Sequence, residues 1–227
     1  MRHSVLSLII VTIIIGVVML GVIIIGFYPC GPKIHDRYEK SPGYTQNIEK
    51  NIFQTYPTHN VPPEFLRLVT HLKIQNPEYN HRIFDDEEID SFVQSEYPRY
   101  YESFSRISPK YGVAKADFFR YMVVYHYGGV YFDIKSGCLT PLRDVIHPED
   151  SFVVTKWRVL PLSPTIPNEY AQWCIIAKKN SPYLKAVLEE VHQRILSYDS
   201  EVDGVGKPGV LRLTGPKMFK YVVDNQE

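Results

Sequence analysis

A run without a single charged residue occupies the chain from Val5 to Tyr28. At a rise of about 1.5 Å per residue, a helix of this length crosses the roughly 30 Å hydrocarbon layer of a membrane. A cleaved signal peptide usually has a shorter apolar core that ends at small residues, and no A-x-A pattern ends this run. We therefore expect residues 1–4 to be a short N-terminal tail and residues 5–28 to be an uncleaved transmembrane signal-anchor.

The charges around this run give a mixed signal for its orientation. Arg2 and the amino terminus precede it, whereas Lys33, Arg37 and Lys40 follow it. Basic residues tend to stay in the cytoplasm, so these charges alone do not fix the topology. The short tail favours a cytoplasmic amino terminus, that is, a single-pass type II protein of the Golgi, the ER or another endomembrane. Residues 29–47 are polar and contain Pro and Gly, so we expect a stem there.

Beyond the stem, the spacing of apolar residues switches repeatedly between the strand and helix periods. Strands are predicted at residues 51–55, 79–84, 130–134, 151–157 and 172–177. Helices are predicted at residues 62–76, 86–97, 115–127 and 181–196, with a last helix that begins near Pro216. Strands that alternate with helices indicate an α/β layered sheet, so we expect residues 48–227 to form one α/β domain.

Composition narrows the functional classes. The chain of 227 residues carries 25 basic and 25 acidic side chains, so it lacks the basic excess that nucleic-acid binding needs. Aromatic residues make up 13%, with 17 Tyr, which suits sugar or base recognition as well as ordinary half-buried positions. Neither the G-x-S-x-G nor the H-E-x-x-H pattern of hydrolases is present. Cys138 and Cys174 could pair in an oxidising lumen or remain two buried thiols.

The stretch from residue 114 to residue 142 carries the candidate chemistry. Asp117 and Arg120 share one face of a helix that is otherwise apolar on most sides, and a buried charge pair there needs a reason. Gly128 and Gly129 then give a tight turn. Asp133 follows at the C-terminal end of the next strand, which is the edge where open α/β sheets bind ligands. A carboxylate at this place can hold a hard cation that bridges phosphates, or fix a sugar hydroxyl.

These residues resemble a family of glycosyltransferases with a DXD motif, which includes fungal outer-chain mannosyltransferases and the glucosyltransferase domain of large clostridial toxins. The family pattern is roughly A-x-x-S-D-x-x-R-x-x-x-L-x-x-x-G-G-x-Y-x-D-x-D. Further matches in the family's order are N-I-F-Q-T-Y at residues 51–56, N-P-E-Y at residues 76–79, D-D at residues 85–86 and T-G-P at residues 214–216. The resemblance covers about residues 48–220.

The resemblance implies a GT-A-type, Rossmann-like domain that binds a nucleotide-diphospho-sugar and transfers a hexose with retention. By this analogy Asp117 and Arg120 bind hydroxyls of the donor sugar, and Asp133 contacts the metal or the ribose. Tyr131 lines the diphosphate pocket, and Tyr56 replaces an aromatic residue that stacks on the base. The catalytic residues are then Asp133, Asp117 and Arg120. The substrate-binding residues are Tyr56, Tyr131, Lys135, Gly128 and Gly129.

Two departures from the family pattern change this expectation. Lys135 occupies the place of the second Asp of D-x-D, so binding of Mn²⁺ or Mg²⁺ by Asp133 is in doubt. Asp133 could hold the metal with water and other ligands, Lys135 could itself neutralise the leaving phosphate, or Lys135 could point away into solvent. Related enzymes usually continue beyond T-G-P into a segment with further metal or diphosphate contacts. Here the chain ends at Glu227, so we expect a domain that is short at its C-terminal end.

Two functions therefore stay open. The first is a membrane-anchored glycosyltransferase that transfers a hexose from a nucleotide sugar to a glycan, lipid or protein acceptor. The second is an inactive relative that binds sugar or nucleotide-sugar, or acts as a scaffold at the membrane. The sequence does not distinguish among UDP-glucose, UDP-galactose and GDP-mannose as donors.

Overall fold

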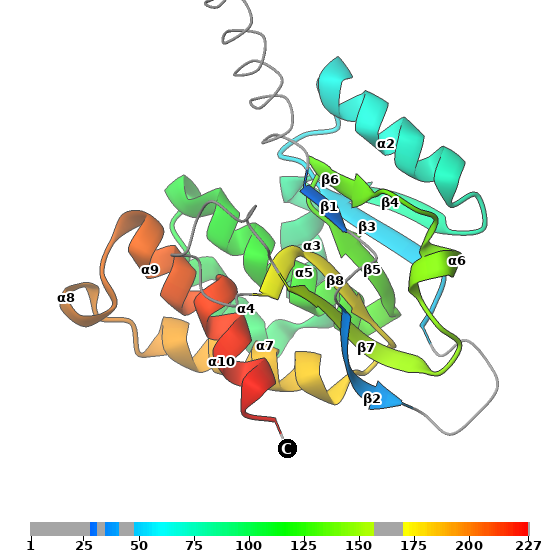
Figure 1. The fold of residues 1–227 in the computed structure, drawn as a ribbon. Coiled ribbons are helices and arrows are strands. Elements are labelled where there is room, and N and C mark those ends of the chain that lie inside the picture. The colour runs from blue at the N-terminus through cyan, green and yellow to red at the C-terminus, as the bar shows by residue number, and fades with distance from the viewer. Residues whose placement is uncertain (1–27, 31–34, 41–47, 157–169, 227) are drawn as a thin grey trace, which may run out of the picture.

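A mixed six-stranded sheet lies at the centre of the molecule (Figure 1). The structure is a computed structural model that describes residues 28–30, 35–40, 48–156 and 170–226. In spatial order the strands are β2 (His35–Lys40), β7 (Asp150–Lys156), β8 (Tyr170–Ala177), β5 (Gly129–Phe132), β3 (Asn51–Thr55) and β4 (Asn80–Phe84). Strand β3 is parallel to β4 and β5, whereas β5–β8, β8–β7 and β7–β2 are antiparallel pairs. The expected α/β sheet is therefore confirmed, with a parallel part and an antiparallel part.

Helices cover both faces of the sheet, with the larger layer on one side (Figure 1). The helices of that layer are α3 (Asp86–Glu96), α4 (Pro98–Arg106), α5 (Gly112–Tyr127), α7 (Pro182–Leu196), α9 (Gly206–Leu213) and α10 (Pro216–Asp224). The other face is covered by α2 (Pro63–Gln75), by the short α6 (Leu142–Val145) and by the parallel pair β1 (Tyr28–Cys30) and β6 (Ser136–Cys138). A 3₁₀ turn, η1 (Pro109–Tyr111), precedes α5, and α8 (Ser200–Asp203) precedes α9.

Alternation along the central strands divides the core in two. Phe53 and Tyr131 face the cluster under α5 and α7, whereas Ile52, Val130 and Phe132 face the cluster under α2 and α6. Side chains that follow each other in a strand point to opposite faces, so strands buried on both sides become continuous apolar runs. Cys138 and Cys174 are buried thiols in the second cluster, which is one of the two states expected for them.

Local chemistry explains where the main helices begin and end. Asp85 Oδ1 accepts a hydrogen bond of 2.8 Å from the Glu88 amide, and Glu88 Oε2 accepts one of 3.1 Å from the Asp85 amide. This capping box satisfies donors that the first turn of α3 leaves unpaired. Helix α5 ends at Gly128, whose φ of 68° suits a residue without a Cβ.

The helices and strands predicted within residues 48–227 are all present, and their observed bounds differ from the predicted ones by a few residues. The sequence pattern did not predict α4, α6, α8, α9, β1 or β6. These are short elements, and helix α4 is held in place by burial of Tyr100 and Phe104 against the larger helical layer. Short helices depend on such packing more than on local propensity, so the sequence signal for them is weak.

The sheet extends into the range that was expected to be a stem. Strand β2, within residues 29–47, pairs antiparallel with β7, with His35 opposite Thr155 and Lys40 opposite Asp150. An antiparallel edge strand needs one partner only, so a polar segment can add to a sheet by its backbone alone. The predicted anchor at residues 5–28 lies outside the described residues, apart from Tyr28 in β1. Within the described part of the chain, no helix combines the length and the apolar character that a membrane span requires.

Candidate active site

Three charged side chains meet where β5 ends beside α5. Arg120 Nη2 lies 2.8 Å from Asp117 Oδ1 and 3.1 Å from Asp133 Oδ1, so one guanidinium bridges two carboxylates. Asp117 and Arg120 come from one face of α5, as their spacing predicted. Asp133 comes from the first position after β5, where its backbone amide donates to the Trp173 carbonyl at 3.0 Å. We call these three residues the charged cluster.

A second set of polar groups fixes the charged cluster from the C-terminal part of the chain. The Thr214 hydroxyl donates to Asp117 Oδ2 at 3.0 Å, and Arg120 Nη1 donates to the Gln172 carbonyl at 3.1 Å. The Tyr121 hydroxyl donates to the Thr214 carbonyl at 2.9 Å, and the Gln172 amide nitrogen donates to the Tyr121 hydroxyl. The T-G-P motif at residues 214–216 is visible in the sequence, but no local pattern predicts the bond from Thr214 to Asp117. Gln172 carried no sequence signal.

The members of the charged cluster differ in exposure. The side chains of Asp117 and Arg120 are 5% and 6% exposed, whereas that of Asp133 is 40% exposed. Asp133 is therefore the carboxylate of the cluster that a ligand reaches most easily. The two oxygens of Asp117 are each bonded to a protein group, so Asp117 serves mainly to hold Arg120.

Burial also sets the protonation of the charged cluster. Desolvation raises the pKa of the Asp117 carboxyl to about 7, against the opposite effects of Arg120 and the Thr214 hydroxyl. Burial alone would lower the pKa of the Arg120 guanidinium, but Asp133 and Asp117 outweigh this effect and raise it above its ordinary value. Arg120 is thus a permanent cation at the floor of the site.

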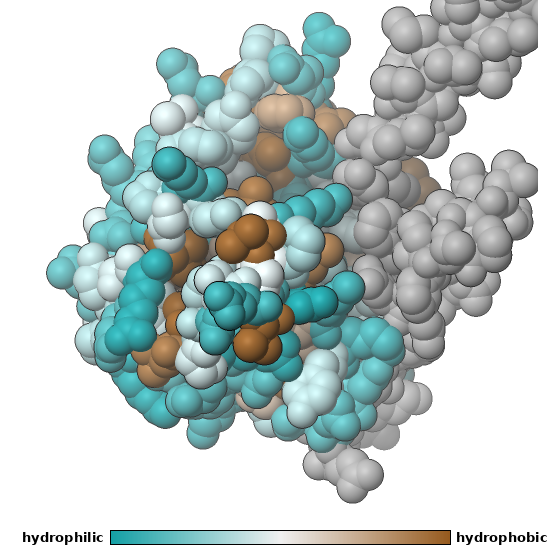
Figure 2. Space-filling view, turned by 90° about the vertical axis from the view of Figure 1, so that its left-hand side faces the viewer, coloured by the Kyte–Doolittle hydropathy of each residue, from teal (hydrophilic) through white to brown (hydrophobic). Residues whose placement is uncertain are grey.

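A cavity of about 470 Å³ opens over the charged cluster. Its lining includes all three members of the cluster, together with Trp173 and Lys207. This volume falls in the range of small-molecule sites in proteins. Helix α9 forms part of its wall, and Figure 2 shows hydrophobic side chains exposed among hydrophilic ones on the face of the molecule that carries α8 and α9. Flat and apolar walls around a charged floor suit a sugar, which has both hydroxyls and C–H faces.

Tyr131 does not face this cavity, contrary to the prediction that it lines a diphosphate pocket. Its side chain is 0% exposed, and its ring lies 4.9 Å from the Arg120 guanidinium carbon. The Tyr131 and Thr55 hydroxyl oxygens are 2.9 Å apart and share a hydrogen bond. Tyr131 therefore supports Arg120 from below, because its position in the middle of the buried sheet leaves no path to a ligand.

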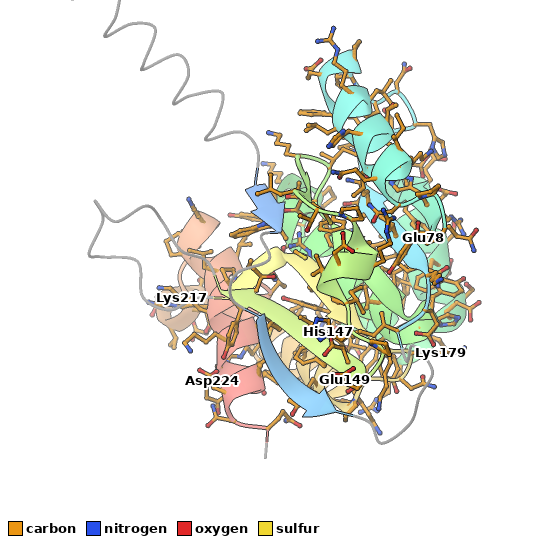
Figure 3. All side chains as sticks on the ribbon, turned by 45° about the vertical axis from the view of Figure 1, so that its right-hand side comes forward. Glu78, His147, Glu149, Lys179, Lys217 and Asp224 are labelled. Carbon is orange, nitrogen blue, oxygen red and sulfur yellow. The ribbon has the colours of Figure 1, made fainter. Side chains whose placement is uncertain are left out.

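Gly128 and Gly129 also lie away from the charged cluster, although they were predicted to bind substrate. Gly128 precedes β5 and Gly129 is its first residue, whereas Asp133 follows its last residue, so the length of the strand separates the glycines from the cluster. A Cβ on Gly129 would lie 2.5 Å from the Asn51 carbonyl oxygen, and one on Gly128 would lie 2.6 Å from the Lys179 amide nitrogen. Lys179 is labelled in Figure 3, where it marks this far end of the sheet. These glycines allow close packing of the chain at that end.

Tyr56 and Lys135 lie beyond Asp133, next to the exit of β3. The Tyr56 and Phe65 ring centroids are 6.0 Å apart, and Tyr56 packs at the edge of a small apolar cluster that contains Ile134. Lys135 is exposed, with Nζ 5.4 Å from the centroid of the Phe65 ring. The structure therefore brings these two predicted residues near one another, on the side of Asp133 that faces β3.

The described residues around Asp133 do not fit a divalent cation. Mg²⁺ and similar hard ions need several oxygen ligands, yet Asp133 Oδ1 already pairs with Arg120, and Lys135 replaces the second carboxylate. Among the described residues, the metal-compatible group of three consists of His59, Asp85 and Glu88, not of the charged cluster. In that group Asp85 and Glu88 form the capping box of α3. Within the part of the chain that the structure describes, the predicted metal ligand Asp133 thus lacks the further ligands that a metal requires.

Comparison with known proteins agrees with the resemblance seen in the sequence. Residues 62–153 match the family described as glycosyltransferase sugar-binding region containing DXD motif. The chain is 36% identical over 111 residues to mannosyl phosphorylinositol ceramide synthase CSH1 of Saccharomyces cerevisiae, covering 48% of this chain and 28% of that protein. It is 27% identical over 201 residues to the initiation-specific alpha-1,6-mannosyltransferase of Candida albicans, covering 77% of this chain and 52% of that protein.

A solved structure shows the same fold. The PaToxG glycosyltransferase superimposes with a TM-score of 0.59 at 18% identity, covering 78% of this chain and 69% of that one. The expected resemblance to DXD glycosyltransferases, fungal mannosyltransferases and a toxin glycosyltransferase is confirmed. The chain spans about a quarter to a half of the length of the curated relatives that it matches.

Proposed function

We propose that this chain is a glycosyltransferase that moves a hexose from a nucleotide-diphospho-sugar to an acceptor hydroxyl, with retention of configuration. The observation that carries the proposal is the charged cluster: a guanidinium fixed between two carboxylates at the floor of a cavity, at the exit of a central strand. Such a fixed arrangement of charge can orient a sugar without reorganising during the reaction.

The geometry suggests a division of roles within the cluster. Asp133, the more exposed carboxylate, accepts hydrogen bonds from hydroxyls of the donor sugar. The Arg120 guanidinium donates to the sugar or to the oxygen atom that joins the sugar to the diphosphate. Asp117 holds the guanidinium in place, and the Thr214 hydroxyl in turn holds Asp117. Replacement of Arg120 by Lys should lower activity, because only the planar guanidinium donates several hydrogen bonds in fixed directions at once.

The names of the relatives favour mannose as the transferred sugar and a lipid or a glycan as the acceptor. The CSH1 relative is named as a mannosyl phosphorylinositol ceramide synthase, and another as an initiation-specific alpha-1,6-mannosyltransferase. GDP-mannose is therefore the first donor to test, followed by UDP-glucose and UDP-galactose. The apolar run at residues 5–28 supports a place at an endomembrane, as a type II protein that meets acceptors there.

A panel of nucleotide sugars tests this function directly. The purified full-length chain is mixed with each donor, and thermal stability, donor hydrolysis and transfer to water-soluble glycans or to lipid vesicles are measured. A true donor raises the melting temperature by mass action and is consumed. The Asp133→Asn variant should lose about 100-fold or more in turnover. Asp144→Asn, an exposed change in α6, serves as the matched control.

A second function is favoured by one observation, the lysine at position 135. If the loss of the second Asp has ended turnover, the chain binds a nucleotide sugar as a sensor or scaffold. In the same panel this function gives a thermal shift without consumption of the donor. The absence of both binding and turnover with all donors would exclude both functions.

A further inference from the structure

Lys135 is held at a defined place beside the charged cluster. It lies in a tight turn that is closed by a hydrogen bond of 2.7 Å from the Ser136 amide to the Asp133 carbonyl. The Gln54 side-chain amide donates to the same carbonyl at 3.3 Å, so the turn is fixed to β3. The Lys135 ammonium lies over the face of the Phe65 ring, and such a ring face attracts a cation. Among the described residues, no carboxylate forms an ion pair with it.

The order of groups along this edge of the sheet matches the order of groups in a nucleotide sugar. Tyr56 and Phe65 form an aromatic pair beyond the exit of β3. The Lys135 ammonium lies over the Phe65 ring of that pair, and Asp133 with Arg120 lies at the exit of β5. Strands β3 and β5 are parallel neighbours, with Phe53 opposite Tyr131, so their exits are adjacent. A base on the aromatic pair and a sugar at Asp133 would put the diphosphate between them, next to Lys135.

The charges at this edge fit an anion rather than a metal ion. A divalent cation placed here would meet one carboxylate that already pairs with Arg120, and an ammonium two residues further on. A diphosphate would instead meet an exposed cation with three N–H donors, which forms no ion pair with a carboxylate among the described residues. Lysine is a competent phosphate ligand as a point charge.

We infer that Lys135 takes over the task of the divalent metal, so that this site binds and releases the diphosphate without a metal ion. The inference rests on the proposed function. In the transfer, the bond from C1 of the sugar to the diphosphate breaks, and its electron pair goes to the terminal phosphate oxygen. The acceptor hydroxyl oxygen bonds to C1, and its proton passes to the diphosphate. Lys135 stabilises the negative charge that develops on the phosphate oxygen.

The test compares the full-length chain in EDTA and in Mn²⁺, with two substitutions at one position. Calorimetry measures binding of GDP and UDP, and donor consumption measures turnover. The unchanged chain should bind a nucleoside diphosphate and turn over its donor equally well in both conditions. Lys135→Gln should bind the diphosphate about 10- to 100-fold more weakly, since a hydrogen bond to a charged group is lost. Lys185→Gln, an exposed change on α7, should behave like the unchanged chain.

Lys135→Asp recreates the spacing of two carboxylates and gives the sharpest outcome. This variant should bind the diphosphate poorly in EDTA and recover in Mn²⁺, which makes it metal-dependent where the natural chain is not. If the natural chain binds the diphosphate or reacts only in Mn²⁺, or if Lys135→Gln is unaffected, the inference is overturned while the proposed function stands. If the natural chain binds neither nucleotides nor nucleotide sugars in either condition, both are overturned.

Discussion

Arg120 reaches out of helix α5 to Asp133 at the end of β5, with 3.1 Å between its Nη2 and the carboxylate Oδ1. The same nitrogen is 2.8 Å from Asp117 Oδ1, and the guanidinium is almost wholly buried. A buried arginine between two acids means that each partner depends on the others, because an unpaired charge in this place would be strongly unfavourable. The stability of the fold and the arrangement of charge in the candidate site therefore depend on the same three side chains.

Removing the guanidinium should destabilise the protein as well as inactivate it. At a pH above the Asp117 pKa of about 7, Arg120→Gln leaves an ionised Asp117 buried without its cation, so we expect the free energy of unfolding to fall by about 3–5 kcal/mol. Denaturation in urea measures this change. Arg99→Gln is the control, because Arg99 pairs with Glu189 at 2.9 Å but its side chain is 67% exposed. The exposed Arg99–Glu189 pair should contribute at most about 1 kcal/mol to the free energy of unfolding. Equal losses of unfolding free energy in Arg99→Gln and Arg120→Gln would contradict the role of the buried cluster.

The stability of the protein should fall with rising pH because of Asp117. Its pKa is raised from 3.8 to about 7 in the folded chain, so the folded state holds a proton that the unfolded state has already lost. The contribution of Asp117 protonation to the free energy of unfolding is full below pH 3.8, and it disappears as the pH rises through about 7. Across this window the unfolding free energy falls by at most about 1.4 kcal/mol per pH unit for a single group.

The comparison of natural chain and Asp117→Asn isolates this group from the other titrating side chains. The variant cannot titrate at this position, so the difference between the two unfolding free energies should change across the window in the stated direction. Measurements by urea denaturation at several pH values give this difference. A difference that is constant with pH would show that Asp117 has an ordinary pKa.

The hydroxyl of Tyr131 should matter little for donor binding. The residue is wholly buried and bonds to Thr55, so Tyr131→Phe should lower stability by about 1 kcal/mol and leave the KM for the donor within about twofold. Tyr131→Leu removes the ring beneath Arg120 and should lower turnover more strongly. A large increase of KM in Tyr131→Phe alone would restore the prediction that this hydroxyl contacts the diphosphate.

The two glycines at the start of β5 should be needed for folding rather than for binding. Gly129→Ala would force a Cβ to within 2.5 Å of the Asn51 carbonyl oxygen, at a φ of 117° that L-residues rarely adopt. We expect a loss of roughly 1–3 kcal/mol or more in the free energy of unfolding. Gly112→Ala is the matched control, because it meets nothing within 4 Å at the start of α5. Folded Gly129→Ala protein that has lost donor binding alone would contradict this view.

The amino-acid sequence by itself determined the longer elements and the polar positions of the site. Apolar periodicity placed α5 and β5, and the spacing of Asp117 and Arg120 placed them on one helix face. These signals are local, because each depends on the geometry of one helix or strand. The position of Asp133 at the end of a buried strand was enough to select the edge of the sheet where the cavity over the charged cluster lies.

Only the tertiary structure decided which residues complete the site. The Thr214 hydroxyl and the Gln172 carbonyl reach the charged cluster from segments that are distant in sequence, and no local pattern specifies such a contact. Tyr131 was placed in a pocket by analogy, but the alternation of β5 and the burial of both sheet faces turn it into a support for Arg120. Gly129 belongs to the opposite end of the same strand. Distances between separate elements arise from packing of the whole chain, and the sequence pattern of one element does not contain them.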